Sequence, residues 1–168
     1  MKISFDIRGN LQPYATIELE WNEFWQEFVD KFDSDSSRFV IFEQLSQYLN
    51  DFIDLTQTDF VLWIDGSFTT TKLNPADVDF VILLDSSVHE ENSKILEEKF
   101  LGQSLTNSLL DCYIVKVYPQ NHPKHVITEL DKLYWQNWFG RTRTNRQNRH
   151  FPKGFIELKI AYKLWKSK

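Results

Sequence analysis

Two short apolar runs separated by a polar loop constrain the fold of this chain more than any other feature. The runs are FVLWI at residues 60–64 and VDFVILL at residues 78–84, and both are rich in β-branched and aromatic side chains. Nearly continuous apolar runs of this length are typical of strands that are covered on both faces of a sheet. The sequence therefore predicts two central strands joined by a loop at 66–77.

Segments with helical spacing of apolar residues surround these strands in the sequence. Helices are predicted at 21–32, 36–55, 86–102 and 122–139, with Asn22 or Glu20 near the first start and Ser36 or Ser37 capping the second. Extended pieces are predicted within 2–18 and at 108–118, and 154–165 fits a strand or a helix. We expect an α/β (α+β) domain with a mixed, mostly antiparallel central sheet flanked by helices.

The length of 168 residues fits one domain with a sizeable core. Fourteen Phe, six Trp and six Tyr indicate a packed interior rather than disorder. We predict a single domain over 1–168, with an N-terminal extension at about 1–35 and a basic C-terminal segment at about 140–168.

The chain has one cysteine, so no intramolecular disulfide can form, and a reducing, cytoplasmic setting is expected. Cys112 directly follows Asp111 and is expected to face the other side of its strand as a buried structural thiol. The four histidines have no metal-ligand spacing. No run of about 18 apolar residues occurs, so neither a membrane span nor export is expected.

Charge is unevenly distributed along the chain. Residues 1–100 carry 20 acidic and 7 basic side chains, whereas residues 101–168 carry 4 acidic and 12 basic ones. Such a distribution suits chemistry on polyphosphates or nucleic acids, because it can bring a basic face near an acidic pocket. It equally suits a simple attraction between the two halves of the chain.

The loop between the central strands has the features of a phosphate site. Gly66 lets backbone amides approach a ligand closely, a following helical turn would direct free N–H groups at phosphate oxygens, and Ser67 adds a hydroxyl donor. Asp77 and Asp79 follow after nine residues, and residues two apart on a strand share one face. Two neighbouring carboxylates repel each other unless a cation lies between them, which indicates a hard divalent ion such as Mg²⁺.

This pattern resembles the nucleotidyltransferase superfamily of the DNA polymerase beta type, in which a Gly-Ser turn precedes Asp-x-Asp and a later strand supplies a third carboxylate. Asp111 in SLLDCYIV fits that third position. The whole chain is most similar to a group of mostly uncharacterised bacterial nucleotidyltransferase-like proteins. The shared segments here are FDIRGNLQP, an aromatic and acidic helix, GSFTTTKLNPADVD and KGFIEL.

The resemblance implies roles for six residues. Asp77, Asp79 and Asp111 would bind Mg²⁺ or Mn²⁺, and Asp111 would also deprotonate or orient an incoming hydroxyl. Gly66 and Ser67 would hold the nucleoside triphosphate, and Lys72 is either a further phosphate contact or a solvated loop lysine. Asp65 is expected only to cap or close the turn, and Asp85 to cap a helix or loop.

A segment without apolar residues, RTRTNRQNRH, is predicted to be a surface loop. Its basic side chains would bind the triphosphate or an RNA or DNA acceptor, or would be solvated and offset the acidic half: Arg141, Arg143, Arg146, Arg149, His150 and the nearby Lys153. The preceding aromatic residues would form core or a base-stacking surface: Tyr134, Trp135, Trp138 and Phe139.

These features favour a Mg²⁺-dependent enzyme that moves a nucleoside monophosphate from an NTP, such as ATP, to a hydroxyl of a protein, an RNA or a small molecule. The alternative is a catalytically silent module of the same fold in a bacterial toxin-antitoxin or phage-defence system, because a fold does not establish an activity. A nucleic-acid-binding protein that acts through the arginine segment is the third interpretation.

Overall fold

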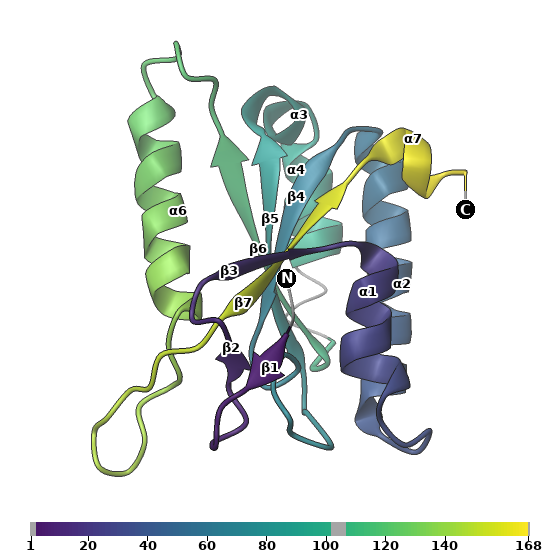
Figure 1. The fold of residues 1–168 in the computed structure, drawn as a ribbon. Coiled ribbons are helices and arrows are strands. Elements are labelled where there is room, and N and C mark those ends of the chain that lie inside the picture. Colours follow the sequence, from purple (N-terminus) through teal and green to yellow (C-terminus); the bar gives the residue numbers. More distant parts are fainter. Residues whose placement is uncertain (1–2, 102–106, 168) are drawn as a thin grey trace.

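A five-stranded mixed sheet forms the centre of the molecule (Figure 1). The computed structural model describes residues 3–101 and 107–167. The sheet has the order β3-β7-β4-β5-β6, with these bounds: β3 Thr16–Leu19, β4 Phe60–Asp65, β5 Val78–Asp85, β6 Leu110–Val117 and β7 Phe155–Ile160. The two apolar runs of the sequence form the adjacent strands β4 and β5, as predicted. A separate antiparallel pair, β1 (Ser4–Phe5) and β2 (Leu11–Gln12), precedes the sheet.

The predicted α+β class and mixed sheet are confirmed, but the expectation of a mostly antiparallel sheet is wrong. β4 pairs antiparallel with β5 and β7, whereas β5 with β6 and β3 with β7 are parallel. β6 is parallel to β5 because the chain between them, which includes α3 (Ser86–Glu91), α4 (Ser93–Ile95) and η2 (Leu96–Leu101), crosses back to the other end of the sheet. The predicted helix end near Gly102 lies outside the described residues.

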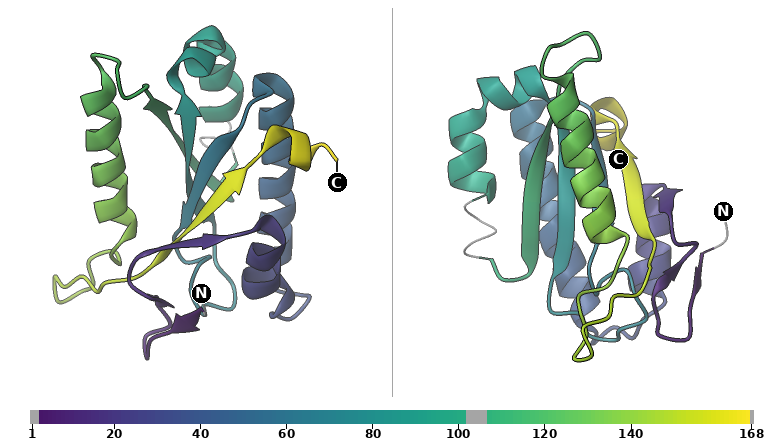
Figure 2. Two further views of the ribbon diagram at one scale, coloured as in Figure 1. Left: turned by 45° about the horizontal axis from the view of Figure 1, so that its top comes forward. Right: turned by 90° about the vertical axis from the view of Figure 1, so that its left-hand side faces the viewer.

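Helices lie on both faces of the sheet (Figure 2). The main core forms between one face and α1 (Trp21–Trp25), η1 (Gln26–Asp30), α2 (Ser37–Thr56) and η2. The other face packs against α6 (His125–Phe139), and this smaller core contains Trp63, Val81, Leu83, Val115, Phe139 and Phe155. The final predicted segment forms β7 and a short helix, α7 (Tyr162–Trp165).

Local signals set the helix ends. Ser36 caps α2 by accepting a hydrogen bond from the Arg38 amide, and Glu20 forms a capping box with Glu23 at the start of α1. Asp85 caps α3, since its carboxylate accepts a 2.8 Å hydrogen bond from the Ser87 amide. The predictions for Ser36, Glu20 and Asp85 are therefore confirmed.

Cys112 lies in the main core, on the face opposite to Asp111, as predicted. Its Sγ is 3.0 Å from the Tyr48 hydroxyl, and burial raises the pKa of the Cys112 thiol to about 12. No helix within residues 3–101 and 107–167 has the length and apolar character needed to cross a membrane.

A buried arginine connects α2 to the loop between β4 and β5. The Arg38 guanidinium donates hydrogen bonds of 2.6 to 3.1 Å to four backbone carbonyls, those of Phe28, Phe68, Thr70 and Lys72. Its charge also lies 3.9 Å from the centre of the Phe32 ring. Burial lowers the pKa of Arg38 to about 10, so the guanidinium stays charged at neutral pH.

The two serines beside Arg38 extend this anchor. The Ser36 hydroxyl donates to the Leu73 carbonyl and the Ser37 hydroxyl to the Pro75 carbonyl, both at 2.6 Å. The first turn of α2 thus fixes the loop backbone from residue 68 to residue 75, although this loop contains no regular secondary structure.

We predict that Arg38→Met lowers the free energy of unfolding by about 3 kcal/mol, because it leaves several buried carbonyls without donors. Urea denaturation followed by circular dichroism measures this loss. Lys31→Met removes a solvent-exposed i,i+4 ion pair with Glu27 and should cost less than about 0.5 kcal/mol. Equal losses for the two variants would show that Arg38 does not anchor the loop.

Candidate functional site

Three aspartates on neighbouring strands form a row at one end of the sheet. Asp65 of β4 pairs in register with Asp79 of β5, and Asp79 pairs in register with Asp111 of β6. Directly paired residues of adjacent strands project from the same face. Val81 follows Asp79 by two residues and packs under α6, so the three carboxylates lie on the α6 face.

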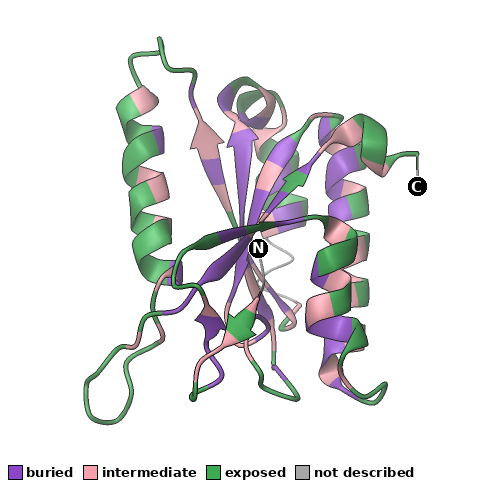
Figure 3. Cartoon of the chain, in the orientation of Figure 1, coloured by how far each residue is buried: buried purple, intermediate pink, exposed green. Residues whose placement is uncertain are grey.

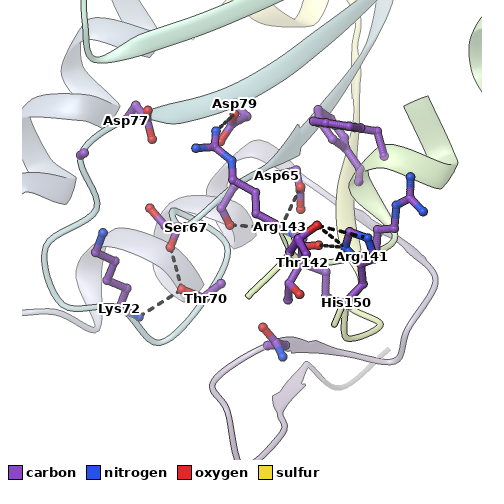
Figure 4. A pocket seen from close by; sticks show the side chains of 17 residues that line it. Asp65, Ser67, Thr70, Lys72, Asp77, Asp79, Arg141, Thr142, Arg143 and His150 are labelled. Carbon is purple, nitrogen blue, oxygen red and sulfur yellow. Dashed lines mark hydrogen bonds and ion pairs between the residues drawn. The ribbon is translucent and has the colours of Figure 1, made fainter. Parts of the chain in front are cut away.

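Asp77 joins this row from the end of the loop. It comes two residues before Asp79, and both residues line one cavity (Figure 4). Burial, followed by the charges of Asp77 and Asp111, raises the pKa of Asp79, whereas Arg143 opposes the shift. Burial, followed by the charge of Asp111, raises the pKa of the Tyr113 hydroxyl. The structure thus brings together Asp77, Asp79 and Asp111, the three aspartates that the sequence singles out.

Gly66 and Ser67 form a tight turn directly beside Asp79. Gly66 has a φ of +82°, and a Cβ atom at this position would lie 1.9 Å from Asp79 Oδ2. Only glycine fits, both in conformation and in space. The turn is closed by hydrogen bonds from the Thr70 hydroxyl and amide to the Ser67 carbonyl, at 2.7 and 3.3 Å. The expected helical turn after Gly66 is present only as this single turn.

A cavity of about 680 Å³ opens between the turn, the aspartates and the C-terminal end of α6. Its wall includes Asp65, Asp77 and Asp79 on one side and Trp138 and Phe139 on another. Asp111 lies beside Asp79 but does not form part of the wall. Other predicted residues that line the cavity are Gly66, Ser67, Lys72, Arg141, Arg143, His150 and Lys153.

The arginine-rich segment forms a hairpin-like loop at the cavity. The backbones of Arg141 and Pro152 form an isolated antiparallel β-bridge, and the Thr142 amide donates a hydrogen bond to the Phe151 carbonyl at 2.8 Å. Arg143 Nη2 is 3.6 Å from Asp79 Oδ1, although 82% of the Arg143 side chain is exposed. Arg146 and Arg149 lie farther out and are exposed. We call residues 141–153 the basic hairpin. Arg143 and Lys153 of the basic hairpin contact the aspartates, whereas Arg146 and Arg149 face solvent.

Lys153 and Asp65 form a buried ion pair that the sequence did not reveal. Lys153 Nζ is 2.8 Å from Asp65 Oδ2, and the two side chains are only 8% and 6% exposed. Burial raises the pKa of Asp65 to about 7, although the ammonium group of Lys153 favours the ionised carboxylate. Asp65 thus does more than close the turn, since it holds the end of the basic hairpin against β4.

The aromatic residues of α6 divide between two environments. Phe139 is buried and Trp135 contacts it with ring centroids 5.4 Å apart. Tyr134 and Trp138 are about half exposed, and their rings are nearly parallel at 6.4 Å. Phe139 and Trp135 therefore belong to the smaller core, whereas Tyr134 and Trp138 are exposed enough for a ligand or partner to stack on them.

The donor chemistry of the site suits a hard divalent ion, because Asp77, Asp79 and Asp111 offer carboxylate oxygens from one sheet end. In the described parts of the chain, no group of three His, Cys, Asp or Glu side chains lies in a ready-made ligand arrangement. Among the described residues, Arg143 forms an ion pair with Asp79 Oδ1, so an ion bound at this oxygen would compete with the exposed Arg143 side chain.

Residues 3–159 match the model of the family described as "Family of unknown function (DUF6932)", and the chain therefore belongs to this family. Neither the curated proteins nor the solved structures give a significant match to the chain.

We predict that Lys153→Met destabilises the fold by about 3 kcal/mol at pH 7.5, because it leaves an unpaired carboxylate in a buried position. The loss should shrink towards pH 5. In both proteins burial raises the folded pKa of Asp65 above its ordinary value of 3.8, so protonation favours the folded state. Lys153 lowers this pKa, and the wild-type carboxyl therefore ionises at about pH 7 while the variant carboxyl stays protonated to higher pH, so the difference in stability grows as the pH rises through about 7 and shrinks below it.

Urea unfolding at several pH values tests this prediction. Lys159→Met serves as the matched control, because it removes an exposed ion pair with Glu18 on the neighbouring strand and should cost less than about 1 kcal/mol at every pH. The double variant Lys153→Met with Asp65→Asn should recover part of the loss. A double variant as unstable as the sum of its single changes would contradict the coupling.

Proposed function

We propose that this protein is a Mg²⁺- or Mn²⁺-dependent nucleotidyltransferase that moves a nucleoside monophosphate from an NTP to a hydroxyl group. One observation carries the proposal: the in-register pair Asp79 and Asp111, with Asp77 beside them, lies next to the Gly66–Ser67 turn. This combination agrees with the resemblance of the sequence to polymerase beta type enzymes. The size of the adjoining cavity, about 680 Å³, is suitable for a nucleotide.

The carboxylates of Asp77, Asp79 and Asp111 would hold the divalent ion, which when bound offsets negative charge on the phosphates and on the reacting oxygens. The Gly66–Ser67 turn would receive the triphosphate, with Lys72 as a further contact from the loop that Arg38 anchors. Arg143 would exchange its contact with Asp79 for phosphate oxygens, since its exposed side chain can move and arginine binds phosphate in a bidentate manner.

In the proposed reaction, the acceptor hydroxyl oxygen attacks the α-phosphorus atom in line with the bond to the β-phosphate. A new P–O bond joins the nucleoside monophosphate to the acceptor, the α–β bridging bond breaks, and pyrophosphate leaves. Asp111 would accept the hydroxyl proton or orient the hydroxyl, as the resemblance implies, because it is paired in register with Asp79 and projects from the same face of the sheet.

We predict that wild-type protein with Mg²⁺ and α-labelled NTPs transfers label to an acceptor in a cell extract, and that Asp77→Asn with Asp79→Asn lowers the rate at least about 100-fold. Asp85→Asn is the control. Asp85 lies on the same strand but at its other end, where Asn can also cap α3. Equal labelling by all three proteins would exclude this chemistry.

Ligand binding distinguishes the enzyme from the silent module. If the protein is the proposed enzyme, calorimetry with Mg²⁺ and NTP should detect an interaction at millimolar or lower concentrations, and the Asp77→Asn, Asp79→Asn double variant should lose it. A folded wild-type protein that binds neither Mg²⁺ nor NTP would favour the module.

We also propose that the outer part of the basic hairpin binds a polyanionic acceptor such as RNA. No acidic residue occurs between Lys132 and Glu157, and Arg146 and Arg149 are exposed within this stretch. Their charges are therefore available to phosphates.

We predict that Arg146→Gln with Arg149→Gln weakens the binding of a labelled single-stranded RNA and lowers the slope of log K against log salt concentration by about 1 to 2. Fluorescence anisotropy at several salt concentrations gives both quantities. Lys94→Gln with Lys163→Gln removes the same charge at a distance from the cavity and should have less effect. Identical slopes for the two double variants would mean that the hairpin makes no specific contribution.

A further inference from the structure

Helix α6 is apolar on two opposite faces. Its inner face packs on the sheet through Thr128, Trp135 and Phe139. Its outer face is exposed along most of the helix (Figure 3). Six large apolar residues of α6 are each 44% to 62% exposed: Val126, Ile127, Leu130, Leu133, Tyr134 and Trp138. At 100° per residue, these six positions fall in one continuous arc of the helix surface, which contains Asn137 as its main polar member.

An outer face of this kind is unusual for a surface helix. A helix on the surface of a globular protein normally has an apolar stripe towards the core and polar residues towards water. The other exposed large apolar residues of the described chain lie scattered on different elements, for example Ile7, Val40 and Leu164. The outer face of α6 therefore differs from ordinary surface hydrophobicity, and contiguous patches of this type mark contact surfaces.

We propose that the outer face of α6 is the interface of a homodimer in which two α6 helices pack antiparallel across a two-fold axis. This proposal does not depend on the nucleotidyltransferase function.

The area supports a second copy as the occupant. The six side chains together expose roughly 600 Å², and a stable interface buries about 800 Å² on each partner. Asn137 within the arc and the flanking exposed residues Glu129 and Gln136 would provide much of the remaining area, the last two as part of a polar rim.

The shape of the stripe also suits an antiparallel copy of itself. The aromatic residues Tyr134 and Trp138 lie in the C-terminal half, and the aliphatic Val126 and Ile127 lie in the N-terminal half. Antiparallel pairing places large side chains against smaller ones at both ends, with Leu130 and Leu133 near the axis. A uniform distance between the helices results, and each pair of equivalent contacts occurs twice.

Charge favours the same occupant over a nucleic acid. Helix α6 carries Glu129 and Asp131, and these are offset by Lys132 within the helix and Lys124 just before it. A balanced surface imposes no like-charge repulsion on two copies, whereas a polyanion is better matched by the basic hairpin. Because the cavity adjoins the C-terminal end of α6, antiparallel pairing places the two cavities at opposite ends of a helix about 22 Å long.

Sedimentation equilibrium of the full chain tests the proposal. The wild type should be a dimer at micromolar concentrations, and Leu130→Glu should weaken dimerisation at least about 100-fold by placing charge near the axis. Leu164→Glu is the matched control, because Leu164 is 68% exposed on α7 and its replacement should leave the dimer intact. Circular dichroism verifies that all variants remain folded.

Cysteine crosslinking tests the direction of packing. Val126→Cys and Asn137→Cys proteins should crosslink with each other under mild oxidation far more than either does with itself, and buried Cys112 should not compete. A monomeric wild type, a dimer that Leu130→Glu leaves unchanged, or preferential Val126→Cys self-crosslinking would each overturn the proposal. If Leu130→Glu fails to fold, Leu133→Lys replaces it, and a dimer that persists in that variant has the same consequence.

Discussion

The buried guanidinium of Arg38 is the interaction on which the candidate site depends. The chain between β4 and β5 has no regular secondary structure, so its carbonyl groups need partners from elsewhere. Arg38 supplies donors to three carbonyls of this loop and to one of η1, and Ser36 and Ser37 add two more donors. The beginning of α2 thus determines the path of the loop that leads from Gly66 to Asp77. A charged side chain without hydrogen bonds could not be buried there.

A second constraint is the crowding of carboxylates at one end of the sheet. Asp79 lies beside three other aspartates, which is unfavourable unless cations are near. The basic hairpin supplies two, through Lys153 at Asp65 and Arg143 at Asp79. The acidic first part and the basic last part of the sequence therefore attract each other directly, as one reading of the charge pattern expects. The two contacts differ, because Lys153 is buried and fixed, whereas Arg143 is exposed and can move.

Much of the fold is predictable from the sequence because it depends on local patterns. The apolar runs of β4 and β5 indicate buried strands, and the alternation around Asp111 places Cys112 on the opposite face. The parallel pairing of β3 with β7 was not predictable, since strand direction depends on long-range connections. The pairing of Asp65 with Lys153 was missed for the same reason. The one local signal was the position of Asp65 at the end of an apolar run and directly before Gly66, which indicates a buried carboxylate that needs a partner.

The aromatic stripe of α6 shows how sequence patterns can mislead about burial. Apolar residues at helical spacing normally indicate core, and this holds for Phe139 but not for Trp138. Trp138 belongs both to the cavity wall and to the outer apolar face. A second helix packed on that face would restrict its ring and also define one side of the cavity entrance. In the proposed dimer, Trp138 alone of the six outer-face residues would contact both the cavity and the partner, so the interface would adjoin the site through this one side chain.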